Sequence, residues 1–429
     1  MNIRVLAALA ILLAGCATTQ PTTAPTDATP ATTAADQVAK DVTVPSAPST
    51  GPRPPTRLYD ACDKLCEPSV TVDGKARLVV TETMQRKGGY LAVIDGNGTV
   101  ARVAYPPTPS GTTADAFQQD NLVQTDSQGR LVFSAMVSDW FPNGQHAYFN
   151  TVGLQVAVSP DSGRTWSSNV LVTIPALAAP LHDRQWLAFG PDNVMYLVFQ
   201  QIPTGIWAAR SDDGGSTFQT AMPVATHADR LYVRASGLPA VDHDGRLVVP
   251  YFAVLDPTTT DTEASATVRI AVSTDKGLTF TQTIVAVEPS DHGAWPTVVA
   301  DDGNGLHLSW ASATEGVLVA HSADHGATWT AATAWVKEGV IPEQTWMATT
   351  PQKTLLVAWY AKDGNGHVLR LARGGANYAD PQEEAITMSP KLAGGQPSTD
   401  FPNFTVMADG TVASVWGETD AGVTLGLTR

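Results

Sequence analysis

The sequence is poor in cysteine, in basic residues and in long apolar segments. Its 429 residues include three cysteines, and 26 lysines and arginines stand against 41 acidic residues, which gives a formal net charge of −15. A chain without a basic excess is not suited to nucleic acid, which is bound through basic surfaces, nor to an anionic membrane surface. After the first fifteen residues, no apolar run is long enough to cross a membrane.

The motifs of several enzyme classes are missing as well. The chain has no Gly-x-Ser-x-Gly, no phosphate-binding loop, no His-Glu-x-x-His and no dinucleotide fingerprint. Its nine histidines are scattered, and the spacing of its cysteines does not fit a zinc site. We therefore expect no cofactor and no metal.

A helical period of 3.6 residues is also absent over any stretch of twelve residues or more. Instead a unit recurs, in which two strands flank a turn rich in Asp, Asn and Gly, and a third strand, a second turn and a fourth strand follow. The second strand of this unit is the most apolar. It occurs seven times, at residues 77–80, 130–133, 194–198, 246–249, 305–308, 354–357 and 411–414.

An eight-residue pattern, Ser-x-Asp-x-Gly-x-Thr-aromatic, occurs four times and starts at positions 159, 211, 273 and 322. Within a turn, an Asp side chain accepts backbone N–H bonds and a Gly allows a positive φ. The aromatic residue then re-enters a strand and packs on the sheet. We therefore expect structural roles for the four aspartates, Asp161, Asp213, Asp275 and Asp324.

This pattern resembles the Asp-box of bacterial sialidases and related repeat proteins. Together with a repeat of about 50 residues, it predicts an all-β fold, a β-propeller built from four-stranded antiparallel blades. The seven second strands favour seven blades, and the six blades of the sialidase family are the alternative. Because the last unit ends after three strands, we expect residues 41–45 to supply its missing edge strand.

The N-terminus has the features of an export signal, since Arg4 precedes a short apolar run. Residues 13–16, Leu-Ala-Gly-Cys, resemble the lipobox of bacterial lipoproteins. The resemblance implies that residues 1–15 are a signal peptide and that Cys16 carries the lipid. Because Ala17 is not an Asp, the same resemblance favours the outer membrane of a bacterial cell envelope. This lipid is the only membrane contact that we expect.

The segment after the lipid site, residues 16–57, is rich in Thr, Pro, Ala and Ser. Such a segment buries too little apolar surface to fold, so it is predicted to be a disordered tether. Residues 58–429 are predicted to form the propeller. The remaining cysteines, Cys62 and Cys66, are an even pair in an oxidising compartment and favour a disulfide.

The predicted topology places the loops on two rims of the ring. The turns between strands one and two share one rim with the Asp-box turns. The loops between strands two and three share the other rim with the connections between blades. Ligands of propellers gather at the channel mouth on this second rim, which is rich in aromatic and polar residues and therefore suits a glycan. The predicted ligand-binding residues are Arg184, Arg230, Arg234, Trp186, His292, Trp295, Trp346 and Trp140.

Two alternatives stay open for these residues. Trp186, Trp295 and Trp346 also fit core residues that occupy one repeated position of the blade. Asp183 and Arg184 also fit a local ion pair.

A sialidase activity would require further groups. The resemblance implies arginines that bind the substrate carboxylate, a Tyr nucleophile activated by a Glu, and an Asp acid/base. The Arg-Ile-Pro stretch of the family is absent from this sequence. The residues that match these roles on the second rim are Tyr360 with Glu315 or Glu343, and Asp139 or Asp183.

Three functions follow from this reading. We favour a monomeric, lipid-anchored protein that binds glycans or another envelope-facing ligand at the channel mouth. An active exo-sialidase or other glycoside hydrolase is the first alternative, and a protein-interaction scaffold is the second. A Tyr–Glu pair among clustered arginines would favour the enzyme. A shallow rim lined by Trp would favour binding, and a flat or plugged mouth would favour the scaffold.

Overall fold

The computed structural model describes residues 37–44, 55–59, 68–81, 89–138, 151–173, 181–202, 204–228, 231–255, 266–289, 295–303, 305–312, 314–336, 342–363, 366–374, 386–389, 392–393, 403–418 and 422–428. The predicted signal peptide, Cys16, Cys62 and Cys66 lie outside these residues. No helix among the described residues is long and apolar enough to cross a membrane.

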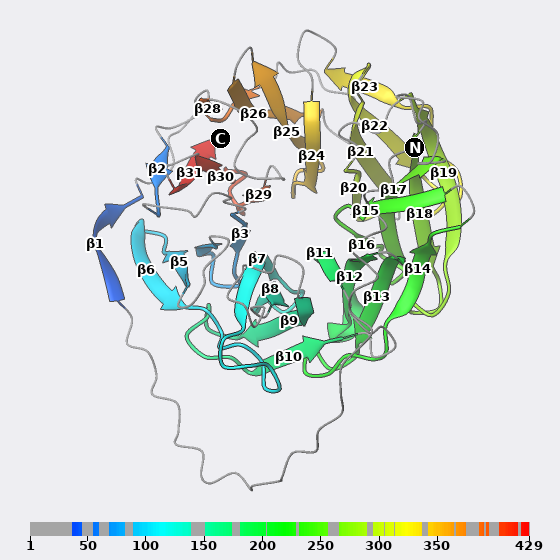
Figure 1. The fold of residues 1–429 in the computed structure, drawn as a ribbon. Coiled ribbons are helices and arrows are strands. Elements are labelled where there is room, and N and C mark those ends of the chain that lie inside the picture. The colour runs from blue at the N-terminus through cyan, green and yellow to red at the C-terminus, as the bar shows by residue number, and fades with distance from the viewer. Residues whose placement is uncertain are drawn as a thin grey trace, which may run out of the picture. The chain divides into compact units, whose positions relative to one another are not determined.

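Seven antiparallel sheets stand around a central channel, so the fold is a seven-bladed β-propeller (Figure 1). The prediction of seven blades is therefore confirmed. We number the blades 1 to 7 in the order of their innermost strands. These are β3 (Val70–Val72), β7 (Phe117–Thr125), β11 (Leu181–Phe189), β15 (Leu231–Ser236), β20 (Thr297–Ala300), β24 (Pro342–Thr349) and β29 (Asn403–Val406).

The strands follow one another outward from the channel in each blade. The second strands are β4 (Leu78–Val80), β8 (Leu131–Ser138), β12 (Met195–Ile202), β17 (Leu247–Leu255), β21 (Leu306–Ser312), β25 (Leu355–Asp363) and β30 (Val412–Glu418). The third strands are β5 (Tyr90–Ile94), β9 (Thr151–Ser159), β13 (Gly205–Ser211), β18 (Ala266–Ser273), β22 (Gly316–Ser322), β26 (Gly366–Arg373) and β31 (Gly422–Thr428).

The fourth strands are β6 (Thr99–Ala104), β10 (Ser168–Val172), β14 (Met222–Thr226), β19 (Thr281–Glu288), β23 (Thr333–Val336), β27 (Ile386–Thr387) and β2 (Thr56–Arg57). Three further strands extend the sheets: β1 (Gln37–Thr43) pairs with β6, β16 (Ala240–Val241) with β17, and β28 (Leu392–Ala393) with β26. A 3-10 turn at Pro191–Asn193 joins β11 to β12.

The N-terminal segment closes the ring, but not through residues 41–45. Thr56 and Arg57 pair with Leu425 and Thr424 and complete blade 7. The predicted stretch belongs largely to β1, which adds a fifth strand to the outside of blade 1. The prediction named the wrong segment because the buried Tyr59 fixes the chain beside blade 7. The strands of the propeller thus begin at Gln37, earlier than the expected boundary at residue 58.

Apolar side chains fill the junctions between neighbouring blades. Tyr59 packs with Val80 of blade 1 and Val415 of blade 7 in one such cluster. The second strands contribute to clusters on both of their faces, because each blade is covered by a neighbour on either side. For this reason the second strands are largely buried, including the few polar residues within them, such as Ser134 of β8 and Ser309 of β21.

The four Asp-box turns join the third strand to the fourth in blades 2 to 5 and share one geometry. In the turn that starts at Ser273, the Ser hydroxyl accepts the N–H of Gly277 at 2.7 Å, and Asp275 accepts the N–H and the hydroxyl of Thr279 at 2.9 and 2.6 Å. These bonds from Thr279 lower the pKa of Asp275 to about 2. The carboxylate is thus used within its own turn.

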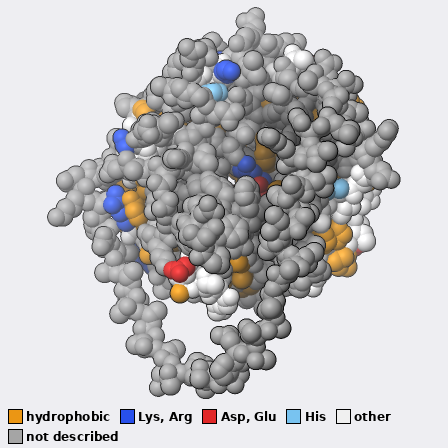
Figure 2. All heavy atoms as spheres, in the orientation of Figure 1, with side chains coloured by type: hydrophobic (Ala, Val, Ile, Leu, Met, Phe, Trp, Pro, Cys, Tyr) orange, Lys and Arg blue, Asp and Glu red, His pale blue; other side chains and the backbone are white. Residues whose placement is uncertain are grey.

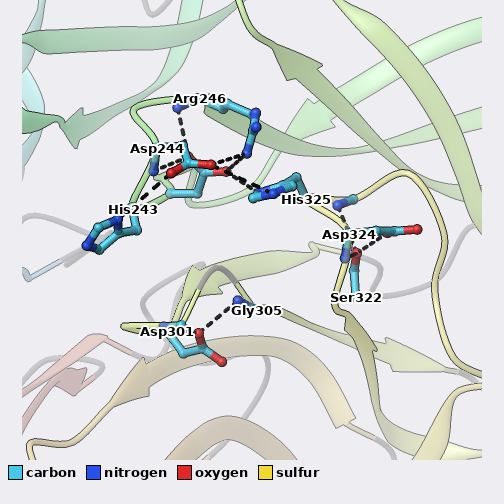
Figure 3. A network of polar contacts seen from close by, with 11 residues as sticks. His243, Asp244, Arg246, Asp301, Gly305, Ser322, Asp324 and His325 are labelled. Carbon is cyan, nitrogen blue, oxygen red and sulfur yellow. Dashed lines mark hydrogen bonds and ion pairs between the residues drawn. The ribbon is translucent and has the colours of Figure 1, made fainter.

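The fourth residue of an Asp-box turn also contacts the preceding blade. Ser162, with φ 66°, donates a hydrogen bond to Asp73 in the first turn of blade 1. His325, with φ 60°, contacts Asp242 of blade 4 through an Nδ1–Oδ2 distance of 3.0 Å. Figure 3 shows His325 and Arg246 directed at the carboxylate of Asp244 as well, at 3.8 and 3.0 Å. Polar bonds therefore join the blades on this rim.

We expect Gly215→Val to lower the free energy of unfolding by about 1–3 kcal/mol, because a β-branched residue resists a positive φ. Gly215 has φ +86°, and an added Cβ would lie 2.9 Å from Cγ2 of Val158. Chemical denaturation measures the loss. Gly96→Val is the control, because open space surrounds Gly96. Since the turn lies on the rim opposite the channel mouth, ligand binding should persist. Lost binding at unchanged stability would contradict this division of the rims.

Candidate functional site

The innermost strands carry β-bulges where they begin, at the channel mouth. The register shifts between Gln119 and Leu122 in β7, and between Asp183 and Trp186 in β11. The same kind of shift occurs between Val233 and Ala235 in β15 and between Pro342 and Thr345 in β24. Bulges re-aim side chains and gather near functional sites.

Two of these bulges hold a polar residue in the left-handed region of φ. Asp120 has φ 50° in blade 2, and Arg184 has φ 55° in blade 3. A non-glycine residue in this region costs free energy that the surrounding structure must offset, and such residues cluster at functional sites. The backbone of Arg234 occupies the corresponding bulge in blade 4. Polar residues of blades 2, 3 and 4 thus occupy equivalent bulges at the start of the innermost strands.

Arg184 is the best-defined charged group of the mouth. The Cζ atom of its guanidinium lies 4.8 Å from the centroid of the Trp295 ring, so the two groups stack. Its Nε atom lies 3.6 Å from Oδ1 of Asp183. The Arg184 side chain is 15% exposed and that of Asp183 is 32% exposed, so solvent reaches both. Figure 2 shows basic and acidic side chains together in a hollow near the centre of the ring.

A pair of tryptophans forms the floor of this mouth. Blades 3 and 6 are three places apart in a ring of seven, so they face each other across the channel. Trp186 of blade 3 and Trp346 of blade 6 nevertheless meet edge to face, with ring centroids 5.5 Å apart and an interplanar angle of 61°. Their rings therefore meet across the channel.

Cavities lie on both sides of this floor. A small one, of about 20 Å³, is lined by Asp120, Arg184, Gln185 and Asn403 on the side of the mouth. A larger one, of about 330 Å³, runs along the later residues of the innermost strands, such as Thr125 and Thr349, and its described lining has no charged side chain. The charged side chains that line these two cavities thus lie on the mouth side of the tryptophan pair.

Hydrogen bonds between blades hold the innermost strands in place. Ser69 and Val123 join blades 1 and 2 through the Ser hydroxyl, which donates to the carbonyl at 3.2 Å and accepts the N–H at 3.1 Å. The N–H of Val70 donates to the amide oxygen of Asn403 of blade 7 at 3.0 Å. Gln185 donates to the carbonyl of Asp120. Such bonds preorganise the mouth, because they fix the backbone from which its side chains project.

The structure corrects the predicted nucleophile. Tyr360 lies in the middle of β25 with no exposed surface, in the cluster between blades 6 and 7 that also contains Trp416. A substrate at the mouth cannot reach a hydroxyl buried in this way. Glu315 is exposed in the turn between β21 and β22. The burial of Tyr360 therefore argues against its predicted role as a nucleophile at the mouth.

The remaining predicted residues fall into three groups. Arg184 contacts both Asp183 and Trp295, and their roles in ligand binding or catalysis stay predictions. Trp186 and Trp346 are buried, at 2% and 8% exposure, so they form the floor and not an open platform. The residues Asp139, Trp140, Arg230 and His292 and the side chains of Arg234 and Glu343 lie outside the described part of the chain.

The sequence also placed Asp120, Gln185 and Asn403 at the start of innermost strands on this rim, but they were not among the predicted ligand-binding residues. Each precedes the apolar residue with which an innermost strand reaches the channel: Leu122, Trp186 and Phe404. A polar residue ahead of this apolar position is thus the sequence signal for the mouth. Among the described residues, no group of three His, Cys, Asp or Glu side chains is arranged to hold a metal ion.

Comparison with known proteins agrees with the fold. No family model matches the sequence, and no curated protein matches it. A protein of unknown function from Dyadobacter fermentans has a TM-score of 0.53 at 16% identity, over 74% of this chain and 96% of that one. This likeness shows a shared fold.

More distant solved structures include two glycosidases. The sialidase of Trypanosoma rangeli in complex with the inhibitor DANA has a TM-score of 0.46 at 13% identity, over 81% of this chain and 58% of that one. An α-L-arabinofuranosidase from Fusarium graminearum has a TM-score of 0.38 at 11% identity, over 57% of this chain and 92% of that one. This chain thus spans little more than half the length of the sialidase.

Proposed function

We propose that the channel mouth binds a glycan that carries a carboxylate. The observation that carries this proposal is the placement of Arg184, whose guanidinium is stacked on Trp295 and directed to the mouth by a strained bulge. A guanidinium pairs with a carboxylate through two parallel N–H···O bonds. Because contact with the Trp295 ring already holds the guanidinium in place, less side-chain freedom is lost when a ligand binds.

The other groups at the mouth suit the rest of a sugar. Asp183 is partly exposed beside Arg184 and can accept hydrogen bonds from ligand hydroxyls. Trp295 is half-buried, and an indole packs against the apolar face of a pyranose ring.

Binding fits these observations better than hydrolysis. Tyr360, the nucleophile predicted from the sequence, is buried between two blades. The contact of Trp186 with Trp346 crosses the channel, so a ligand at the mouth would rest above these rings, as suits a protein that holds the end of a glycan chain. We also propose, from the lipobox at residues 13–16, that a lipid on Cys16 holds the propeller at the bacterial envelope.

The test is a titration of the purified chain with N-acetylneuraminic acid and with glucuronic acid, followed by calorimetry. We expect binding of at least one of these acids, and Arg184→Ala should weaken it about ten- to a hundredfold, because a charge-assisted hydrogen bond contributes roughly 1.5–3 kcal/mol. Arg164→Ala is the matched control, since Arg164 is exposed on the Asp-box rim. Equal binding of galactose, or an unchanged affinity in Arg184→Ala, would contradict the proposal.

A further inference from the structure

The larger of the two channel cavities lies away from the proposed glycan site. It measures about 330 Å³ and is bordered by Thr125, Thr349 and Val406, the last residues of β7, β24 and β29. The innermost strands run from the mouth to the Asp-box rim, so the cavity lies towards that rim. Its volume is within the range of small-molecule sites, roughly 300–1,000 Å³. The channel therefore has room for a second ligand.

The described wall of this cavity is mainly apolar and has no charged side chain. Four aromatic residues contribute to it: Trp186, Phe189, Trp346 and Phe404. A charged ligand that leaves water for such surroundings finds no counter-charge, and its transfer is strongly unfavourable. The cavity therefore favours an uncharged ligand, in contrast to the mouth with its Arg184 guanidinium.

Most polar side chains of the wall are already bonded within the protein. The amide of Gln124 donates to the carbonyl of Leu187 at 3.0 Å and accepts the N–H of the same residue at 3.1 Å. The hydroxyl of Thr125 donates to the carbonyl of Val72 at 2.7 Å. The hydroxyl of Ser69 is bonded to blade 2, as described above. These side chains join neighbouring blades, so the wall has few polar groups left for a ligand.

Three polar side chains of the wall keep hydrogen-bonding capacity. Asn403 is 4% exposed, and its amide oxygen accepts the N–H of Val70 at 3.0 Å, so its amide nitrogen is the donor that remains. The hydroxyls of Thr349 and Thr405 are the other two groups. Within the described residues, neither this nitrogen nor these hydroxyls have a hydrogen-bond partner. All three belong to blades 6 and 7, so the free groups lie on one side of the cavity.

We propose that this cavity binds a small uncharged aromatic molecule with one polar group, such as a phenol or an indole. The ring of the ligand packs against the aromatic residues of the wall. Its hydroxyl or N–H donates to Thr349 or Thr405, because the amide nitrogen of Asn403 cannot accept. A neutral sugar fits less well, because it carries several hydroxyls and finds free partners on one side only. The proposal is independent of glycan binding, since neither Arg184 nor Asp183 lines this cavity.

The test is calorimetric titration of the purified full-length chain with p-cresol and with toluene, which lacks the hydroxyl. We expect p-cresol to bind saturably. The double variant Thr349→Val/Thr405→Val keeps the shape of both side chains and should weaken p-cresol binding about two- to tenfold, as the loss of a neutral hydrogen bond does. The affinity of this variant for toluene should not fall. Thr333→Val, at an exposed position of β23, is the control and should change neither affinity.

A cavity-filling variant locates the bound ligand. Ala348 lines the cavity, and Ala348→Phe should weaken p-cresol binding at least about tenfold, because the added ring occupies the space. Ala104→Phe adds the same ring to the exposed end of β6 and should leave binding unchanged. Unfolding midpoints show that each variant is folded. Tyramine, a phenol with an ammonium group, should not displace p-cresol.

Three results would overturn the proposal. The first is a parent chain that does not bind p-cresol. The second is an unchanged affinity for p-cresol in Ala348→Phe or in the threonine double variant. The third is displacement of p-cresol by tyramine at equal concentration, because a charged ligand would then be accepted as well as an uncharged one.

Discussion

Tyr59→Ala is expected to lower the free energy of unfolding by about 3–5 kcal/mol, as for other large aromatic residues removed from a core. Tyr59 is 1% exposed and stacks on Tyr90 with ring centroids 4.9 Å apart. Its single O–H lies 2.9 and 3.0 Å from the carbonyls of Val80 and Tyr90 and donates to them, and its oxygen accepts the N–H of Ala92 at 2.9 Å, so the one proton is shared between two acceptors. The residue thus fixes the segment that closes the ring, and its loss opens the junction of blades 7 and 1.

The variant Tyr59→Phe separates the contribution of the aromatic ring from that of the hydroxyl. This variant keeps the aromatic ring but removes the hydrogen-bond partner of buried backbone groups. We therefore expect the free energy of unfolding to fall by about 1–3 kcal/mol. Chemical denaturation of both variants gives the values. A Tyr59→Ala protein as stable as the parent chain would show that ring closure does not depend on this residue.

Cys16→Ser is expected to move the protein from the membrane fraction to the soluble fraction. Stable membrane attachment of a lipidated protein requires two acyl chains or an additional basic patch, and this chain is acidic. If Cys16 carries the lipid, as we propose, its replacement removes the attachment completely. The measurement is fractionation of cells followed by a high-salt wash of the membranes.

Cys62→Ser is the matched control for this prediction, because it removes a thiol outside the lipobox. We expect it to remain in the membrane fraction. If Cys16→Ser still sediments with membranes after the wash, the lipobox interpretation is wrong.

Much of the fold was predictable because the repeats mark it. The four Asp-box turns mark the junction of the third and fourth strands in blades 2 to 5. The seven apolar second strands indicate seven blades. The closing strand was not predictable in the same way. β2 consists of Thr56 and Arg57 alone, and two residues carry no pattern that distinguishes them from a linker. Its position depends on Tyr59, whose partners lie in blade 1.

Only those positions of the candidate site that follow from the order of strands in a blade could be predicted from the sequence. The order of strands assigned Asp183, Arg184 and Trp295 to the mouth, and the structure brings them together. Tyr360 was misassigned because second strands are apolar on both faces, so alternation does not reveal which residues reach a loop. The contact between Trp186 and Trp346 depends on the width of the channel, which local sequence does not encode.

The most direct test of the proposed binding site is a crystal structure of the chain soaked with N-acetylneuraminic acid or glucuronic acid. We predict a bound acid at the channel mouth, with its carboxylate within hydrogen-bonding distance of the Arg184 guanidinium and its ring above the floor formed by Trp186 and Trp346. An acid bound at the Asp-box rim, or a mouth that stays empty while calorimetry detects binding, would contradict the account.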